Sequence, residues 1–341
     1  MQGDQIQTAP WVVITSINPP TAAIRKISAL CTSGWSAVVV GDTKSPPDWH
    51  AENIHFLSVS EQKSRYGDLA ELIPYRHYCR KNLGYLYAIE NGASLILDTD
   101  DDNIPMEGFG RNIQRGVAGR LLGGAEWVNV YKHFSDENIW PRGLPLNRIH
   151  EPGVINSLSR TSDCVIQQFL ADRDPDVDAI HRLVFGGEFF FDAKPPAILE
   201  AGTWCPFNSQ NTVFFPEAFP LLYLPCHVSF RMTDIWRSFV ALAILERAGG
   251  ALAFLAPTVE QLRNEHDLMD DFELEVVGYR FNDSIRTVLR QTLANVAVSW
   301  QTLPEALLGC MTALVRAGHA PETELKVVKA WLATLLGRQV V

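Results

Sequence analysis

The sequence predicts an α/β fold with a mainly parallel sheet flanked by helices, and two observations support this prediction. Short apolar, β-branched runs alternate with stretches of helical spacing through the first hundred residues, as in consecutive βαβ units. Polar clusters also directly follow three of the expected strands, at 15–18, 41–44 and 98–103. In a parallel sheet such strand ends share one edge, where ligands bind, so a binding site is expected there.

The elements of the first half are expected from local signals. The first strand, WVVIT, is followed by a Pro-containing loop and then by Thr21, which can cap a helix. Residues 76–91 carry apolar side chains at helical spacing. Four strands are expected here, over 11–15, 35–40, 54–59 and 93–97.

The second half is less regular. Residues 126–134 alternate in polarity, which predicts a strand, and 234–248 form an amphipathic helix with Thr233 as a candidate cap. From about residue 283 the pattern is helical to the end, which suggests an appendage packed on the main domain or used for self-association. We expect an N-terminal tail (1–10), an α/β domain (11–282) and a C-terminal helical region (283–341).

The composition argues against a nucleic-acid-binding, membrane-spanning or secreted protein. The chain has 341 residues and a formal net charge of −10, whereas nucleic-acid-binding surfaces are usually basic. No apolar run approaches the roughly 18 residues of a membrane span, and the first ten residues lack a basic signal-peptide region. The six cysteines show no C-x-x-C spacing and are expected to be reduced. We therefore expect a cytoplasmic protein without nucleic-acid partners or a transmembrane segment.

The acidic run at 98–103 follows an apolar strand signal directly. In extended backbone Asp98, Asp100 and Asp102 point one way and Asp101 the other. Carboxylates about 7 Å apart on one face repel, by roughly 2 kcal/mol per pair at an effective dielectric constant of ~20. A compensating oxygen-preferring cation, Mg²⁺ or Mn²⁺, is therefore expected.

Three other interpretations of the acidic run exist. A solvated acidic loop is the ordinary alternative, but the run follows a strand rather than polar residues. An EF-hand would need Gly and Glu where Asn103 and Phe109 stand. A two-metal nuclease stays open from the carboxylates alone, although the acidic net charge counts against it.

A strand ending in D-x-D that holds a cation against a diphosphate resembles the GT-A nucleotide-sugar glycosyltransferases. Longer segments, all in one order, resemble the STELLO-type glycosyltransferase-like family: 72–76 with 80–85, 98–103, 140–145, 206–211 and 263–267. The triple Asp, 174–179 and the R-G-x-P at Arg142 more distantly resemble the UDP-arabinopyranose mutases, or reversibly glycosylated polypeptides. The resemblance covers about residues 11–280, without the helical tail, and implies a GT-A-like fold and nucleotide-sugar binding.

Roles for the acidic residues follow from this resemblance. Asp102 is expected to bind the metal ion directly, and Asp100 to bind the metal, a metal-bound water or the ribose. Asp101 is expected to contact the sugar or a second-shell water. His266, in the last of the matched segments, is the candidate metal ligand from outside the run, whereas Asp98 is either structural or part of the site.

Cationic and polar residues complete the expected site. Arg80 and Lys81 precede the acidic strand and are candidates for the diphosphate, with a solvated helix face as their alternative. Arg142 is a candidate for phosphate binding, and the mutase resemblance adds self-glycosylation or sugar handling. Asn208 and Asn211 can read sugar hydroxyls. The nucleoside is expected at the first two strand ends, on Thr15, Asn18, Asp42 and Lys44.

An inverting transfer needs a carboxylate that accepts the proton of the acceptor hydroxyl. Asp234, at the start of an expected helix, is the candidate, although the helix dipole alone also favours Asp there. The expected function is a metal-dependent glycosyltransferase that uses a UDP-sugar and a glycan, lipid or protein acceptor. The alternatives are a UDP-sugar mutase or self-glycosylating protein, and a non-catalytic nucleotide-sugar-binding partner of another transferase.

Overall fold

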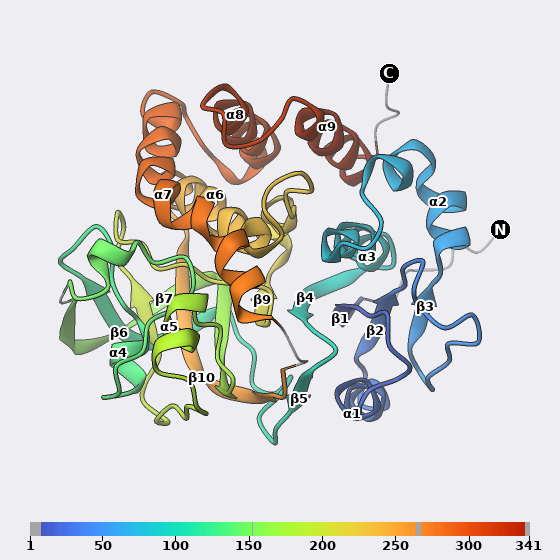
Figure 1. Ribbon diagram of the computed structural model, residues 1–341, viewed down its shortest axis with the longest axis horizontal. Coiled ribbons are helices and arrows are strands. Elements are labelled where there is room, and N and C mark those ends of the chain that lie inside the picture. The colour runs from blue at the N-terminus through green and yellow to red at the C-terminus, as the bar shows by residue number, and fades with distance from the viewer. Residues whose placement is uncertain (1–7, 152, 264–266, 338–341) are drawn as a thin grey trace.

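The computed structural model describes residues 8–151, 153–263 and 267–337 (Figure 1). Within these ranges the protein is α/β, and ten strands form one sheet in the order β3-β2-β1-β4-β9-β7-β6-β8-β10-β5. The strands are β1 (Ala9–Thr15), β2 (Ser36–Val40), β3 (His55–Leu57), β4 (Ala93–Thr99), β5 (Asn103–Pro105), β6 (Gly116–Gly123), β7 (Val154–Arg173), β8 (Ala197–Leu199), β9 (Asn211–Phe214) and β10 (Ala251–Gln261).

Nine α-helices and five short 3₁₀ helices lie in the described ranges. The α-helices are α1 (Ala22–Cys31), α2 (Val59–Leu72), α3 (Lys81–Glu90), α4 (Tyr131–Phe134), α5 (Ala179–Val184), α6 (Thr233–Ala248), α7 (Leu268–Leu293), α8 (Leu303–Arg316) and α9 (Thr323–Leu335). The 3₁₀ helices are η1 (Tyr78–Arg80), η2 (Leu146–Arg148), η3 (Pro216–Leu222), η4 (Phe230–Met232) and η5 (Trp300–Thr302).

The first half of the sheet is parallel, as expected, and the second half is mixed. β1 pairs in parallel with β2 and β4, and β2 with β3. β9 then runs antiparallel to both β4 and β7. The sheet is therefore mixed rather than mainly parallel. The register of β1 with its neighbours places the carboxyl ends of β1, β2 and β4 at one edge, where the three polar clusters meet.

The core lies on both faces of this sheet, because alternate β1 side chains point to opposite sides. Val13 packs with Leu83 of α3 in the largest buried cluster. Val12 and Ile14 pack with Ile24 of α1 in a second one. Figure 1 shows α1 and α3 on opposite sides of the strands, as in a layered α/β arrangement. Thr21 caps α1 as expected, accepting a hydrogen bond from the backbone N–H of Ile24.

Two local predictions were wrong. Residues 126–134 form no strand: Trp127 makes an isolated bridge to Trp204, and α4 begins at Tyr131. The Asn129 side chain accepts a hydrogen bond from the Tyr131 backbone N–H and so turns the chain locally. Thr233 is not the cap of α6, because η4 leads directly into the helix and Thr233 already has helical geometry.

The C-terminal helices share the main core. The boundary expected between residues 282 and 283 falls inside α7, which runs unbroken through it. Leu307 of α8 and Trp331 of α9 belong to the same buried cluster as Leu83 of α3. The Trp331 indole also donates to the backbone oxygen of Asn82, at 3.1 Å. Among the described helices, none combines the length and apolar character needed to cross a bilayer.

Candidate functional site

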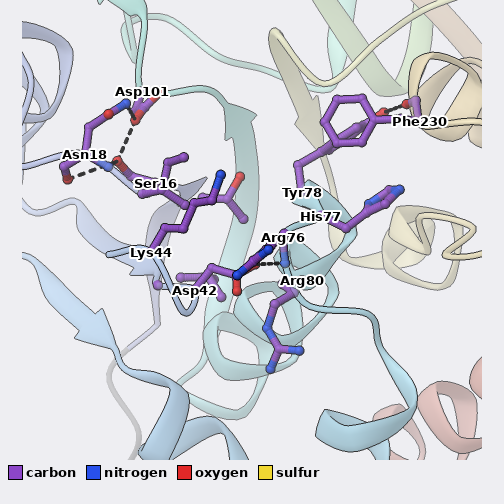
Figure 2. Close-up of a pocket in the computed structure, with 14 residues that line it drawn as sticks. Ser16, Asn18, Asp42, Lys44, Arg76, His77, Tyr78, Arg80, Asp101 and Phe230 are labelled. Atoms are coloured by element: carbon purple, nitrogen blue, oxygen red, sulfur yellow. Dashed lines mark hydrogen bonds between the residues drawn. The ribbon is translucent and has the colours of Figure 1, made fainter. Parts of the chain in front are cut away.

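Two adjoining pockets open at the shared strand ends. The larger, pocket A, has a volume of about 510 Å³ and lies where β1 and β2 end (Figure 2). Pocket B, of about 210 Å³, shares Thr15, Tyr78, Asp101 and Phe230 with it. Pocket A is further lined by Ser16, Ile17, Asn18, Val40, Gly41, Asp42, Lys44, Arg76, His77 and Arg80, and pocket B by Asp100, Asp102, Arg142, Ser209, Arg231, Gln261 and Arg263.

Asp101 connects two of the strand ends. Its carboxylate accepts hydrogen bonds from the Ser16 hydroxyl at 2.5 Å and the Asn18 amide at 3.1 Å, which Figure 2 draws as dashed lines. Its backbone oxygen accepts from the hydroxyl of Thr21 at 2.5 Å. Asp101 therefore fixes the loop after β1 against the loop after β4. One carboxylate oxygen is occupied by the protein itself rather than left for a sugar.

Asp42 shapes the opposite rim of pocket A. Its carboxylate accepts from the backbone N–H groups of Thr43, at 2.5 Å, and Arg76, at 2.6 Å. Arg76 has a positive φ of 58°, which is uncommon for a residue other than glycine. The hydrogen bond to Asp42 holds the backbone of Arg76 at this turn. The Arg76 side chain stays exposed and lines the pocket, as does the exposed side chain of Lys44.

A buried ion network lies below the acidic run. The Lys81 ammonium lies 2.9 Å from Asp98, 2.7 Å from Asp100 and 2.8 Å from the backbone oxygen of Thr99. Arg237 of α6 lies 2.7 Å from the other oxygen of Asp98. Lys81 and Asp98 are fully buried, so Lys81 occupies no solvated helix face. Asp98 acts as the internal counterion that holds both cations.

Asp100 and Asp102 carry charge that the protein compensates incompletely. Burial raises the pKa of Asp100 to about 7; Lys81 opposes this rise, while Asp102 and Asp98 add to it. Burial also raises the pKa of Asp102, against a hydrogen bond from Gln261 at 3.2 Å. Both side chains line pocket B. Two carboxylates that line one pocket, and whose charge the protein compensates only in part, are a suitable pair of oxygen donors for a divalent cation.

The expected third metal ligand, His266, lies outside the described residues. Within the described ranges, no group of three or more His, Cys, Asp or Glu side chains is arranged to hold a metal ion. The fit to a metal therefore depends on Asp100 and Asp102, with the remaining ligands to come from substrate or solvent.

Arg142 and Asp234 form a second buried network. Arg142 donates to both oxygens of Asp176, at 2.7 and 2.9 Å, and to Asp234 at 3.0 Å. The Tyr78 hydroxyl and the Ser209 backbone N–H also donate to Asp234, at 3.1 and 3.2 Å. Burial alone would raise the pKa of Asp234, but Arg142 and Arg237 lower it overall. Asp234 is thus an ionised, buried acceptor rather than a residue lining either pocket.

Three other expected residues use their side chains in hydrogen bonds within the protein. The Arg80 guanidinium donates to Gln62 at 2.8 Å, and Figure 2 shows the side chain pointing away from Asp101. It is buried, not solvated. Asn208 accepts from Gln168 at 3.0 Å, and Asn211 donates to Thr258. Neither asparagine is among the residues lining pockets A and B.

Comparisons with known proteins test the family resemblance. A family model described as STELLO glycosyltransferases matches residues 231–336. Two proteins of Arabidopsis thaliana, "Probable glycosyltransferase STELLO2" and "Probable glycosyltransferase STELLO1", are each 27% identical to this chain over 97% of its length. The STELLO-type resemblance is confirmed. The chain spans less than half of these relatives, 45% and 44% of their lengths.

The STELLO match also corrects the expected extent of the resemblance. It reaches residue 336 and so includes all of α8 and α9, which were expected to lie outside it. It contains Arg231, Asp234 and Arg263, which stand at or beside pocket B.

Several pocket residues were not assigned a role from the sequence. Arg76 and Arg263 lie within segments that carry the STELLO resemblance, so the signal was present. Five further residues lie in or beside short 3₁₀ helices or at the end of β10, where no local pattern indicates a pocket: His77, Tyr78, Phe230, Arg231 and Gln261.

Proposed function

We propose that this chain is a glycosyltransferase with a GT-A-like fold that binds a nucleoside-diphosphate sugar across pockets A and B. The observation that carries the proposal is the position of Asp100, Asp101 and Asp102 between a large pocket and a small polar one. The relatives' names, which describe probable glycosyltransferases, support this reaction class.

Pocket A suits the nucleoside. Its volume of about 510 Å³ lies in the range typical of small-molecule sites. Ile17, Val40 and Phe230 offer apolar surface to a base, while Asn18 and Asp42 offer polar groups. Asp42 has lone pairs beyond its two backbone contacts and can accept an imide N–H. We therefore favour uracil as the base.

Pocket B suits the diphosphate and the sugar. We propose that Asp100 and Asp102 hold Mg²⁺ or Mn²⁺. The cation would neutralise charge that develops on the diphosphate as the sugar leaves. Lys81 serves this arrangement indirectly, because it compensates Asp98 and part of the charge of Asp100 from below.

We propose a positioning role for Asp234 and Arg142. Asp234 already accepts from Arg142, Tyr78 and Ser209, which leaves it poorly placed to take a proton from an acceptor. The nitrogens of Arg142 are likewise committed, to Asp176, Asp234 and the backbone oxygen of Arg231. Self-glycosylation on Arg142 would have to break this network, which counts against that alternative.

A second candidate function is binding of a nucleotide sugar without turnover, in support of another transferase. The commitment of Asp234 to its internal partners favours it, because the residue expected to serve as base is not free. Release of UDP from UDP-sugars, with and without added acceptors, separates the two candidates. A binder without activity retains affinity and releases no UDP.

Calorimetric titration tests the site. UDP, GDP and their common sugar conjugates are titrated with Mn²⁺ and then with EDTA. We expect metal-dependent binding selective for one base, and loss of its metal dependence in Asp102→Asn. Asp192→Asn is the matched control, because Asp192 forms a surface ion pair with Lys194. Unchanged binding in Asp102→Asn would refute the site.

A further inference from the structure

Pocket B contains a partly buried arginine that has only neutral hydrogen-bond partners. Arg263 donates to the side-chain oxygen of Gln261 at 3.1 Å and to the backbone oxygen of Asp174 at 3.4 Å. Its Nε is buried without a hydrogen-bond partner. Across the described ranges no carboxylate forms an ion pair with it. Buried charged groups are usually paired, so among the described residues the buried part of this guanidinium lacks an anionic partner.

A second cation strengthens the need for an anion. Arg231 lines the same pocket, and its guanidinium pairs on the other side with Glu275, at 2.8 Å. Burial lowers the pKa of Arg263, repulsion from Arg231 lowers it further, and Asp176 and Asp102 offset this only in part. An anion bound between the two guanidinium groups would relieve the repulsion.

The carboxylates of the acidic run line the same pocket. The side-chain amide of Gln261 connects one of them, Asp102, to Arg263 by hydrogen bonds. The Gln261 side chain donates to Asp102 at 3.2 Å and accepts from Arg263 at 3.1 Å. Pocket B thus presents both carboxylates and guanidinium groups. A diphosphate that carries a divalent cation matches this distribution, because the cation satisfies Asp100 and Asp102 while free phosphate oxygens remain for the arginines.

We propose that Arg263, with Arg231 beside it, binds the diphosphate of the donor directly. The proposal rests on the proposed function. It places the anion beside Asp102 rather than at the distant end of the sugar, because Gln261 ties Arg263 to that carboxylate.

The test is calorimetry on the full chain with Mg²⁺, using UMP, UDP and inorganic pyrophosphate. A charge-assisted hydrogen bond contributes about 1.5–3 kcal/mol, so Arg263→Gln should weaken UDP and pyrophosphate at least about tenfold. UMP should be affected much less. Arg263→Lys should recover part of the affinity, since it restores the charge without the planar fork. Arg120→Gln, which removes an exposed arginine outside both pockets, is the matched control.

Two outcomes overturn the proposal. The proposal is wrong if Arg263→Gln binds UDP and pyrophosphate as tightly as the wild-type chain does. An equal loss for UMP and UDP, with Arg263→Lys no better than Arg263→Gln, would indicate a general disturbance.

The same titrations separate this proposal from the proposed function. Pyrophosphate binding that depends on Arg263, in a chain that binds no nucleotide, would support the anion site and refute the nucleotide-sugar function. Nucleotide binding that is unchanged in Arg263→Gln would support the nucleotide-sugar function and refute the anion site at Arg263.

Discussion

Asp100 shows at the scale of one residue how burial changes the charge of a carboxyl group in the proposed cation site. Its carboxylate lies 2.7 Å from the Lys81 ammonium, yet burial and the carboxylates of Asp102 and Asp98 raise its pKa to about 7. The ligand-free protein therefore holds a carboxyl group that resists ionisation. A divalent cation would reverse this, because it favours the ionised form.

The pH dependence of stability follows from this pKa. In the unfolded chain Asp titrates near 3.9, so between about pH 4 and pH 7 the folded state binds more protons. The contribution of Asp100 to stability therefore falls as the pH rises through this window. Asp100→Asn should gain stability relative to the wild type between pH 5 and pH 8, by about 1 kcal/mol after allowing for screening, since the side chain is 33% exposed.

Urea unfolding in EDTA at the two pH values measures this difference. Asp163→Asn is the control, because Asp163 is an exposed partner of Arg115 and should show no comparable trend. If the difference in unfolding free energy between Asp100→Asn and the wild type is the same at pH 5 and pH 8, the raised pKa of Asp100 is contradicted.

At the scale of secondary-structure elements, the buried ion network of Arg142 connects α6 with two loops. Asp234 stands in the first turn of α6, while Arg142 and Asp176 come from two separate loops. Removing one partner of a buried pair leaves an uncompensated charge. The network therefore fixes the start of α6 against both loops.

Asp234→Asn tests the positioning role. We expect the free energy of unfolding to fall by about 3 kcal/mol, measured by urea denaturation. Asp270→Asn, in the first turn of α7, is the control and should cost under about 1 kcal/mol. Complete loss of transfer with unchanged stability would instead favour Asp234 as the catalytic base.

The packing of α3 on the sheet depends on a small residue. A Cβ atom at Gly84 would lie 2.5 Å from a Val40 methyl carbon and 2.8 Å from one of Val13. We expect Gly84→Ala to lower the free energy of unfolding by about 1–3 kcal/mol through overpacking. Gly309→Ala in α8 is the matched control, since nothing lies within 4 Å of its Cβ position. Helix propensity should make the control neutral or stabilising; equal effects would contradict this packing.

For the whole molecule, the C-terminal helices are part of the α/β unit. Glu324 of α9 is buried, with the backbone N–H of His227 2.8 Å from its carboxylate. Trp331 is buried against α3 and donates to the backbone of Asn82. The helices therefore cover the layer that supports the acidic strand end, and we expect them to unfold together with the sheet.

Trp331→Ala should lower the free energy of unfolding by about 3–5 kcal/mol through the cavity that it leaves. Helicity and tryptophan fluorescence should follow one coincident transition in urea. Leu336→Ala, at a side chain that is 42% exposed, should change stability little. An early, separate transition for the helical signal would show that the C-terminal region folds independently.

The sequence by itself determined the local features. The strand runs 11–15 and 93–97, the cap at Thr21 and the position of the acidic run after a strand all depend on neighbouring residues, and each is found where expected. Strand ends in a parallel arrangement meet at one edge, so the place of the pockets could also be predicted. Thr15, Asn18, Asp42 and Lys44 accordingly line one pocket.

Only the tertiary structure decided how the charges pair. Lys81 looked available for a diphosphate, but the fold buries it against Asp98, which Arg237 reaches from 139 residues away. Arg263 comes close to the acidic run because Gln261, at the end of β10, contacts both Asp102 and Arg263. Coulomb energy depends on distance and burial, and sequence spacing reports neither for residues that meet through long-range packing.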